Sequence, residues 1–339
     1  MKEKPFIHCF RTYNCCYFYD FNTNAIVRIP ESVYVHLQHL EKGTANISEC
    51  DADVNEILNR LTEQGFLSSH HWCKIEHPAS RLLENYLEGS VQSLTLQVTQ
   101  QCNLKCEYCP YSGGFYNRQH NNRKMSFEIA KKAIDFYFLH SFDIPDAQIG
   151  FYGGEPLIEF EMIRRIVEYC NNEYYGKKIR YFVTTNATLL TEEKLDFLMK
   201  NNFVLTISLD GPRQYHNKNR HRVDDTGSFD IVMENIKMVY RKYHDKKENI
   251  QFNCVIDPEA DLKCINDFFI KEEALREYRV LFNSISREGI KEDDKFLPGD
   301  SYFEQYEYEV FKMMYSKYGK VKGIDAVSYT HLRAHETCA

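Results

Sequence analysis

The sequence predicts an α/β protein in which a parallel sheet with crossover helices follows a small α+β unit. Three observations support this prediction. Between Ser93 and about Asn283, apolar runs of strand length alternate with helical patterns, which is typical of a parallel sheet. Six such strands suit a partial or complete (β/α) barrel. The chain before Ser93 instead has short strands followed by two helices.

The composition fits a soluble globular protein of about two domains. The chain has 339 residues, of which 43% are hydrophobic and 27% are charged. A formal net charge of -7 argues against a general nucleic-acid binder, which needs a surplus of Lys and Arg. No apolar stretch approaches the roughly 18 residues of a membrane span, and the first residues lack the apolar segment of a secretory signal. We therefore expect a cytoplasmic protein without membrane contact.

Residues 1–75 are predicted to form a winged-helix-like domain. Its strand-like runs are expected at His8–Tyr13, Cys15–Asp20 and Ala25–Ile29. Helices are expected over Glu31–Leu40 and about Asp51–Gln64, the second with an apolar stripe of Val54, Ile57, Leu58 and Leu61. Phe66-Leu67 predicts a short returning strand, and residues 76–92 predict a polar linker with a short helix.

Residues 93–285 are predicted to form the barrel. Its strands are expected at Leu94–Thr99, Ala147–Phe151, Ile179–Thr184, Phe203–Leu209, Ile250–Ile256 and Tyr278–Asn283. The helices between them are expected near Ser126–His140, Phe160–Tyr174, Thr191–Lys200, Ser228–Tyr240 and Asp261–Lys271. Because the chemistry of such barrels lies at the C-terminal ends of the strands, residues just after each strand are the candidate site.

Only three of the twelve cysteines form a tight set. Cys102, Cys106 and Cys109 follow the first barrel strand with the spacing C-x3-C-x2-C. Three thiolates in one loop can hold three corners of an iron–sulfur cube and leave the fourth iron open. A zinc knuckle and chance spacing are the alternatives, but structural zinc sites normally close with four ligands, and no second pair follows. We therefore predict that these three residues ligate an iron–sulfur cluster.

Polar residues follow the next strands. Gly153-Gly154-Glu155 comes after the second strand, where two glycines allow a ligand close to the backbone and a carboxylate can accept hydrogen bonds from an amine. Asn186 follows the third strand, and Ser208 and Asp210 end the fourth. Taken singly, these are common turn residues. Their position on the same barrel rim as the cysteines favours a binding site for sugar hydroxyls and carboxylates.

These motifs together resemble the radical S-adenosylmethionine (SAM) superfamily. The resemblance lies in the three-cysteine motif with an aromatic residue before its last cysteine, and in GGE after the second strand. The segments TTNATLL and ISLDGP, followed by His216 and Arg220, are similar to its peptide- and protein-modifying branch. That branch includes thioether-forming maturases and anaerobic sulfatase-maturing enzymes. The resemblance covers about Leu94 to Asn283 and implies a partial (β/α)6 barrel.

The resemblance also implies cofactors and residue roles. Cys102, Cys106 and Cys109 would hold a [4Fe-4S] cluster whose open iron is chelated by the amino and carboxylate groups of SAM. Gly153, Gly154 and Glu155 would contact the SAM amino group, and Tyr108 would lie against the adenine through its backbone. Contacts with the ribose and carboxylate would come from Asn186, Ser208 and Asp210. No catalytic acid or base is implied, and an electron donor such as ferredoxin or flavodoxin is expected.

The function implied by the resemblance is radical modification of a ribosomally synthesised, cysteine-rich precursor peptide, with thioether cross-linking expected. A formylglycine-forming sulfatase maturase and a catalytically incomplete peptide-binding fragment are the alternatives. Residues 1–75 resemble the recognition domain of peptide maturases, which adds a leader peptide as a strand to a sheet edge. A plain winged-helix packing domain is the other interpretation. Nucleic-acid binding is disfavoured by the acidic residues of the second helix, Asp51, Asp53, Glu56 and Glu63.

The C-terminal region departs from the family pattern. Maturases of this branch usually carry a cysteine-rich extension, whereas residues 286–326 contain a helical pattern and no cysteine, and the one later cysteine is Cys338. Residues 327–339 resemble a translated adapter tail and are expected to be non-native. We therefore expect a truncated form of a longer maturase.

Overall fold

The computed structural model describes residues 4–12, 15–43, 51–72, 74, 76–111, 116, 121–257 and 260–285. The chain divides into two compact units, Met1–Arg81 and Leu82–Ala339. The predicted extension at 286–326 and the tail at 327–339 lie outside the described residues. Within the described part of the chain, no helix combines the length and apolarity that a membrane crossing requires.

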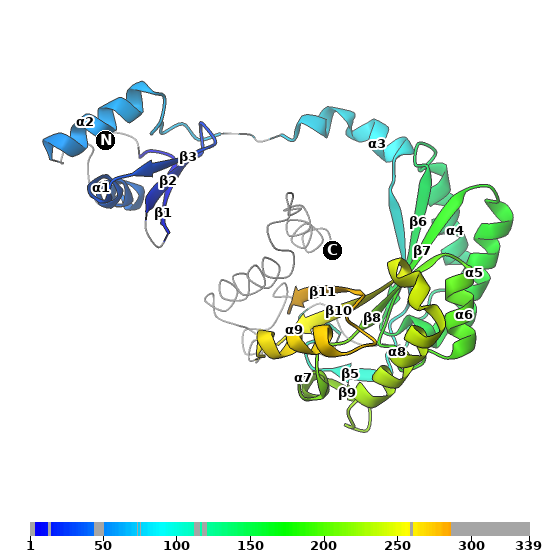
Figure 1. The fold of residues 1–339 in the computed structure, drawn as a ribbon. Coiled ribbons are helices and arrows are strands. Elements are labelled where there is room, and N and C mark those ends of the chain that lie inside the picture. The colour runs from blue at the N-terminus through cyan, green and yellow to red at the C-terminus, as the bar shows by residue number, and fades with distance from the viewer. Residues whose placement is uncertain are drawn as a thin grey trace. The chain divides into compact units, whose positions relative to one another are not determined.

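The N-terminal unit contains a three-stranded antiparallel sheet and two helices (Figure 1). The strands β1 (Ile7–Arg11), β2 (Cys16–Asp20) and β3 (Ala25–Ile29) lie in that order, and α1 (Glu31–Lys42) and α2 (Ala52–Glu63) follow. Alternate residues of β2 are buried, so that Phe18 packs with Leu37 of α1 and Leu58 of α2 in one apolar core. Helix α1 ends at Gly43, whose φ of 72° permits the left-handed cap.

The short strand predicted at Phe66-Leu67 is wrong. Leu67 has a φ of 62°, which is left-handed and incompatible with an extended strand. Its N–H instead donates to Asp20 Oδ2 at 2.8 Å, while Asp20 Oδ1 accepts from the N–H groups of Asn22 and Thr23 at 3.0 and 2.9 Å. The buried Asp20 carboxylate thus fixes both the turn after β2 and the segment after α2. The N-terminal unit ends within η1 (Pro78–Leu82), and the larger unit begins with α3 (Leu83–Gly89).

The larger unit is built on a six-stranded parallel sheet, which confirms the predicted α/β class. Its strands are β4 (Ser93–Thr99), β6 (Asp146–Gly153), β7 (Lys178–Thr185), β8 (Phe203–Ser208), β10 (Ile250–Ile256) and β11 (Arg279–Ser284). They lie side by side in sequence order, with β4 and β11 at the edges. The crossover helices are α4 (Phe127–Leu139), α5 (Phe160–Glu173), α6 (Glu192–Lys200), α8 (Phe229–Tyr243) and α9 (Leu262–Lys271). All carboxyl ends of the parallel strands therefore meet at one edge of the sheet.

Side-chain caps determine where several of these helices begin. Ser126 accepts a hydrogen bond from the N–H of Ile129 at the start of α4. Thr191 accepts from Lys194 at the start of α6, and Asp261 accepts from Lys263 and Cys264 at the start of α9. Each cap satisfies backbone donors that have no partner within the helix. The caps thus define the first turns of α4, α6 and α9.

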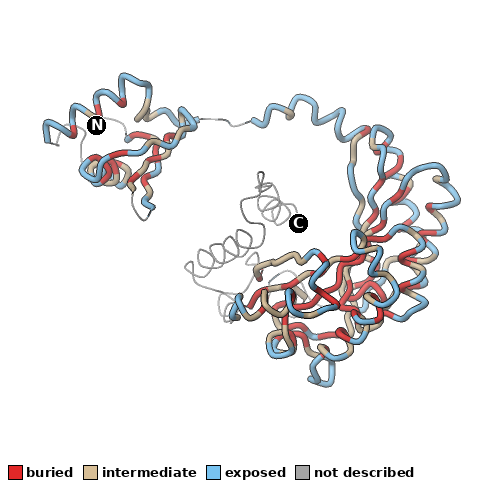
Figure 2. The backbone as a smooth tube through the Cα atoms, in the orientation of Figure 1, coloured by how far each residue is buried: buried red, intermediate tan, exposed pale blue. Residues whose placement is uncertain are grey.

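The outer face of the parallel sheet packs against the crossover helices, and its inner face is more open at β7 and β10 than at β8, whose residues are all buried. In β7 the buried residues Ile179, Tyr181 and Val183 alternate with the less buried Arg180 and Phe182. The buried set belongs to the main apolar core together with residues of α4, α5, α6, α8 and α9. Figure 1 shows α4, α5 and α6 along the outer face, and Figure 2 shows buried positions alternating along the strands. The inner face is therefore available for other contacts.

Three small elements were not expected from the sequence. The strand β5 (Leu104–Cys106) pairs antiparallel with β9 (Arg220–Arg222), and α7 (Arg213–Asn219) precedes β9. Each strand has only three residues, and β9 (Arg-His-Arg) contains no apolar residue. Neither segment is therefore long enough to show the alternation of apolar and polar residues that predicts a strand. This ribbon joins the cysteine loop to the segment after β8.

The core of the N-terminal unit predicts how one of its leucines responds to truncation. Leu37→Ala removes a fully buried side chain and should lower the free energy of unfolding by about 2–5 kcal/mol. The control is Val35→Ala on the same helix, where Val35 is 42% exposed and its truncation should cost less than about 0.5 kcal/mol. Urea denaturation of residues 1–81 checks both values. Equal destabilisation by the two substitutions, or no cooperative transition in this segment, would contradict an independently packed core.

Candidate cofactor site

The three cysteines of the loop after β4 lie in one small apolar cluster. Cys106 is buried with Leu104 and Tyr108, while Cys102 and Cys109 pack against the same cluster and are partly exposed. The N–H of Cys109 donates to the carbonyl of Cys106 at 3.1 Å, which closes the second half of the motif into a turn. The loop therefore places three sulfur atoms in a common, largely dry environment.

This environment keeps Cys102 and Cys106 protonated when no metal is bound. Burial raises the pKa of the Cys106 thiol to about 12, although the neighbouring Arg220 guanidinium opposes the rise. Burial likewise raises the pKa of Cys102 to about 11. Among the described residues, no three His, Cys, Asp or Glu side chains converge as ligands of one metal ion. Three thiolates of one loop are nevertheless the ligand type of an iron–sulfur cluster, in which each thiolate binds a different iron.

The cysteine loop passes directly against the end of β6. A Cβ atom at Gly153 would lie 1.9 Å from the Thr99 carbonyl oxygen, and one at Gly154 would lie 2.1 Å from that of Gln101. The N–H of Gly154 donates to the Thr99 oxygen at 3.0 Å, and the N–H of Glu155 donates to the Gln101 oxygen at 2.8 Å. The backbone that leads into Cys102 therefore occupies the space where a side chain at either position would lie.

The Glu155 carboxylate joins the ends of two strands. It is 1% exposed, and Oε1 accepts from the Leu157 N–H at 3.0 Å and the Thr185 hydroxyl at 2.7 Å. Oε2 accepts from the N–H of Asn186 at 2.7 Å. Burial raises the pKa of Glu155, and these hydrogen bonds oppose the rise. Both carboxylate oxygens are thus engaged by the protein, and the β6 end is tied to the β7 end.

Asn186 links Glu155 to the cysteine loop by hydrogen bonds. Its side-chain oxygen accepts from the N–H and hydroxyl of Thr188 at 3.0 and 2.7 Å. Its amide nitrogen donates to Asn103 Oδ1 at 2.9 Å and lies 3.9 Å from the sulfur of Cys102. Asn103 and Thr188 were not singled out from the sequence, because polar residues in loops are too common to identify a contact.

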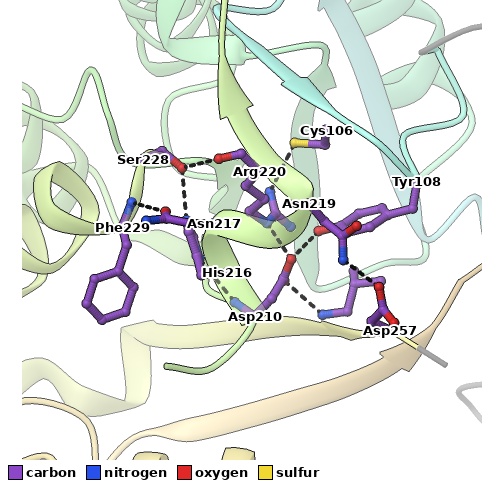
Figure 3. Close-up of polar contacts among 11 residues, drawn as sticks. Cys106, Tyr108, Asp210, His216, Asn217, Asn219, Arg220, Ser228, Phe229 and Asp257 are labelled. Carbon is purple, nitrogen blue, oxygen red and sulfur yellow. Dashed lines mark hydrogen bonds and ion pairs between the residues drawn. The ribbon is translucent and has the colours of Figure 1, made fainter. Parts of the chain in front are cut away.

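Asp210 lies in a buried polar network on the other side of the loop (Figure 3). Its Oδ2 accepts from the Tyr108 hydroxyl and from Arg220 Nε, the latter at 2.8 Å, and its Oδ1 accepts from the Val255 N–H at 3.0 Å. Arg220 Nη1 lies 3.8 Å from the sulfur of Cys106. The pairing of β5 with β9 explains this contact, because it sets Arg220 opposite Cys106.

His216 supports the same network as a neutral ring. Burial lowers its pKa to about 4. Its Nδ1 accepts from the Asp210 N–H at 3.3 Å, so the ring proton lies on Nε2, which is 2.9 Å from the Ser228 hydroxyl. The Ser228 hydroxyl in turn donates to the Arg220 carbonyl at 3.0 Å. His216 therefore holds the segments on both sides of α7 together.

Two further residues lie at the strand ends. Ser208, predicted from the sequence, is buried at the end of β8. Asp257, which the sequence analysis missed, directly follows β10 and accepts from Lys218 Nζ at 3.1 Å and Asn219 Nδ2 at 2.8 Å. Its position after a strand was the signal that could have identified it. The strand ends thus bring all the predicted site residues to one edge of the sheet.

Known proteins are similar to parts of this sequence. The serine-type anaerobic sulfatase-maturating enzyme of Bacteroides thetaiotaomicron is 31% identical over 170 residues, which is 49% of this chain and 37% of that protein. The radical SAM cyclopropyl synthase TigE of Paramaledivibacter caminithermalis is 28% identical over 254 residues, 68% of this chain and 52% of TigE. The chain thus spans about half or less of the length of these two relatives.

The fold is also similar to a solved structure. Native anSMEcpe with bound AdoMet and the Kp18Cys peptide matches with a TM-score of 0.57 at 22% identity, covering 67% of this chain and 60% of that one. At this identity the likeness concerns the fold alone.

The family model of the Radical SAM superfamily matches residues 96–268, which is just over half of the chain. The matched segment includes the three-cysteine loop and Gly153–Glu155, and the loop's donor set fits an iron–sulfur cluster. This match confirms the two predicted cofactors, a [4Fe-4S] cluster and SAM. The chain belongs to the radical SAM superfamily.

Proposed function

We propose that this chain provides the cofactor-binding part of an enzyme that modifies a ribosomally synthesised peptide by radical chemistry. The observation that carries the proposal is the direct hydrogen bonding between the cysteine loop and the Gly153–Glu155 segment. A cluster-binding motif and a SAM-binding motif are thereby held as one rigid unit. Support for a protein or peptide substrate comes from the relative that is named as a sulfatase-maturating enzyme.

Different residues of the site hold the cluster and SAM. Cys102, Cys106 and Cys109 bind the cluster and leave one iron for the amino and carboxylate groups of SAM. When bound, the cluster supplies the electron that cleaves SAM to methionine and a 5′-deoxyadenosyl radical, which takes a hydrogen atom from the substrate. We assign the contact with the SAM amino group to the backbone of Gly153 and Gly154, because Glu155 is 1% exposed and its carboxylate already accepts from three protein donors.

The remaining predicted residues complete the SAM site. The Tyr108 backbone lies at the adenine, and the Tyr108 side chain is anchored on Asp210. Asn186 and Ser208 contact the ribose and the carboxylate of SAM. Asp210 acts through Arg220 and Tyr108, since its side chain is 2% exposed and already accepts from three protein donors.

The inner face of the sheet receives the peptide in this proposal. We propose that the sheet curls as the partial (β/α)6 barrel of the family. Partly exposed polar side chains on the strands include Gln97, Thr184, Gln251 and Asn253. Amide and hydroxyl side chains of this kind can hydrogen-bond a peptide backbone without specifying its sequence. The bond made is proposed to be a thioether from a peptide cysteine.

Formylglycine formation is the second candidate, and the similarity to sulfatase-maturating enzymes favours it. Mass spectrometry of a cysteine-containing peptide after reaction separates the two. Thioether formation removes two hydrogens and retains the sulfur, whereas conversion of cysteine to formylglycine removes the sulfur.

The N-terminal unit is proposed to recognise the leader of the precursor peptide as a winged-helix-like domain. Within the described residues, β1 and β3 are the edges of its sheet, and α1 contacts β1 and β2. The edge of β3 is therefore the proposed site of strand addition, where backbone hydrogen bonds supply most of the affinity.

The first prediction tests the cluster. Changing Cys102, Cys106 and Cys109 together to alanine should abolish iron and sulfide binding after anaerobic reconstitution, because cysteine thiolates are the ligands of such clusters. The control changes Cys15 and Cys264, which are partly exposed and lie outside the loop, and should retain the full iron content. Iron and sulfide assays on both proteins provide the measurement. Full iron in the triple variant would exclude this loop as the cluster site.

A second prediction concerns Glu155. Glu155→Ala leaves buried donors of Thr185 and Asn186 without an acceptor and should weaken SAM binding about ten- to a hundredfold. Because the carboxylate hydrogen-bonds to Thr185 and Asn186 of the protein itself, the same variant should also lower the melting temperature in the absence of SAM. The control is Glu161→Ala, whose side chain is 83% exposed. Weaker SAM binding with unchanged apo-protein stability would instead indicate a direct contact between Glu155 and SAM.

A third prediction concerns the leader. Deleting residues 1–75 should leave SAM cleavage largely intact but reduce peptide modification. Ile26→Asp on β3, where Ile26 is 63% exposed, should weaken leader binding, while Val35→Asp on α1 makes the same change away from the edge and should not. A proline in the centre of the leader should also weaken binding, because it removes a backbone donor. Calorimetry with the leader of the cognate precursor measures these effects. Equal binding by the two Asp variants would argue against the β3 edge.

A further inference from the structure

One cation lies against the buried cysteine of the cluster loop. The Arg220 side chain is 8% exposed, and its Nη1 lies 3.8 Å from the sulfur of Cys106. Its Nε is 2.8 Å from Asp210 Oδ2, and the Asp210 side chain is 2% exposed. A charged pair is costly to bury unless its geometry and hydrogen bonds are well satisfied. The structure therefore retains a full guanidinium charge at the sulfur of a cluster ligand.

The surroundings hold this guanidinium in one place (Figure 3). The β5–β9 pairing sets Arg220 opposite Cys106, and the Ser228 hydroxyl donates to the Arg220 carbonyl. The guanidinium also lies over the Tyr108 ring, 5.5 Å from its centroid. The side chain is thus fixed by its backbone, by Asp210 and by an aromatic ring. These three contacts together hold the guanidinium beside Cys106.

A charge at this position affects the reduction of a cluster more than its assembly. Reduction adds one electron from an external one-electron reductant and breaks no bond in the protein. The potentials of iron–sulfur clusters depend on net charge, hydrogen bonds to the sulfurs and solvent exposure. A nearby cation favours the reduced, more negative state, and a nearby anion disfavours it. In a buried site both effects are poorly screened.

We propose that Arg220 is a positioning residue that sets the reduction potential of the cluster through Cys106, and that Asp210 holds Arg220 in place and moderates its charge. The inference rests on the proposed function, since it requires the cluster on the three cysteines. It assigns to the Asp210–Arg220 pair a role in electron transfer in addition to its role in packing. The two residues have opposite charges, so their removal should shift the potential in opposite directions.

The test is a redox titration of the reconstituted protein with dithionite, followed by electron paramagnetic resonance in the absence of SAM. Omitting SAM excludes any contact between Arg220 and SAM. Arg220→Gln should lower the midpoint potential, and Asp210→Asn should raise it. Each shift should change the ratio of reduced to oxidised cluster at fixed potential by about tenfold, which corresponds to about 59 mV for one electron. The double variant should fall between the two single variants.

Controls separate this role from a structural one. Arg213→Gln removes the charge of an exposed arginine that is paired with Asp230, and should leave the potential unchanged. Arg220→Lys keeps the charge, and its midpoint potential should stay closer to that of the wild type than the potential of Arg220→Gln.

Shifts of the same sign in Arg220→Gln and Asp210→Asn, or no shift in either, would overturn the inference. If Arg220→Gln loses its iron, Asp210→Asn decides: a raised potential supports the proposal and an unchanged one overturns it. A wild-type chain that binds no cluster would contradict the proposed function itself.

Discussion

The site depends on the close approach of two backbone segments at the carboxyl ends of β4 and β6. Gly153 and Gly154 have no room for a Cβ atom because the carbonyl oxygens of Thr99 and Gln101 lie where it would be. The same carbonyls accept the N–H groups of Gly154 and Glu155. This contact fixes the start of the cysteine loop relative to the neighbouring strand. Any side chain larger than glycine would push apart the two segments that together hold the cofactors.

The cysteine loop is held from two sides by chemically different contacts. On one side, Glu155 and Asn186 connect the loop to the end of β7 through uncharged donors and a buried carboxylate. On the other side, Asp210 and Arg220 connect Cys106 to the end of β8 through a buried ion pair. The parallel sheet makes both possible, because it brings strand ends that are far apart in sequence to one edge. The same strand ends therefore determine both where the cysteine loop lies and which charged groups surround it.

The sequence predicted the α/β class and the cluster and SAM cofactors well, because long periodic strands and a spaced cysteine motif are local signals. It did not predict β5, β9 or α7, which are too short to show a period. It did not reveal that the Thr99 and Gln101 carbonyls fill the Cβ positions of Gly153 and Gly154, since that segment is distant in sequence. It also did not reveal the partners of Asp210, because Tyr108, Arg220 and Val255 come together only in the fold. Tertiary contacts of single residues leave no pattern in the sequence.

The coupling between the cysteine loop and the Gly153–Glu155 segment is the central claim. Hydrogen exchange, measured residue by residue on apo and anaerobically reconstituted protein, tests it most directly. Because the Gly154 and Glu155 amides donate to the backbone that leads into Cys102, binding of the cluster should slow exchange at both amides as well as within the loop. If the loop gains protection while the Gly154 and Glu155 amides exchange at unchanged rates, the two segments are not coupled and the account is contradicted.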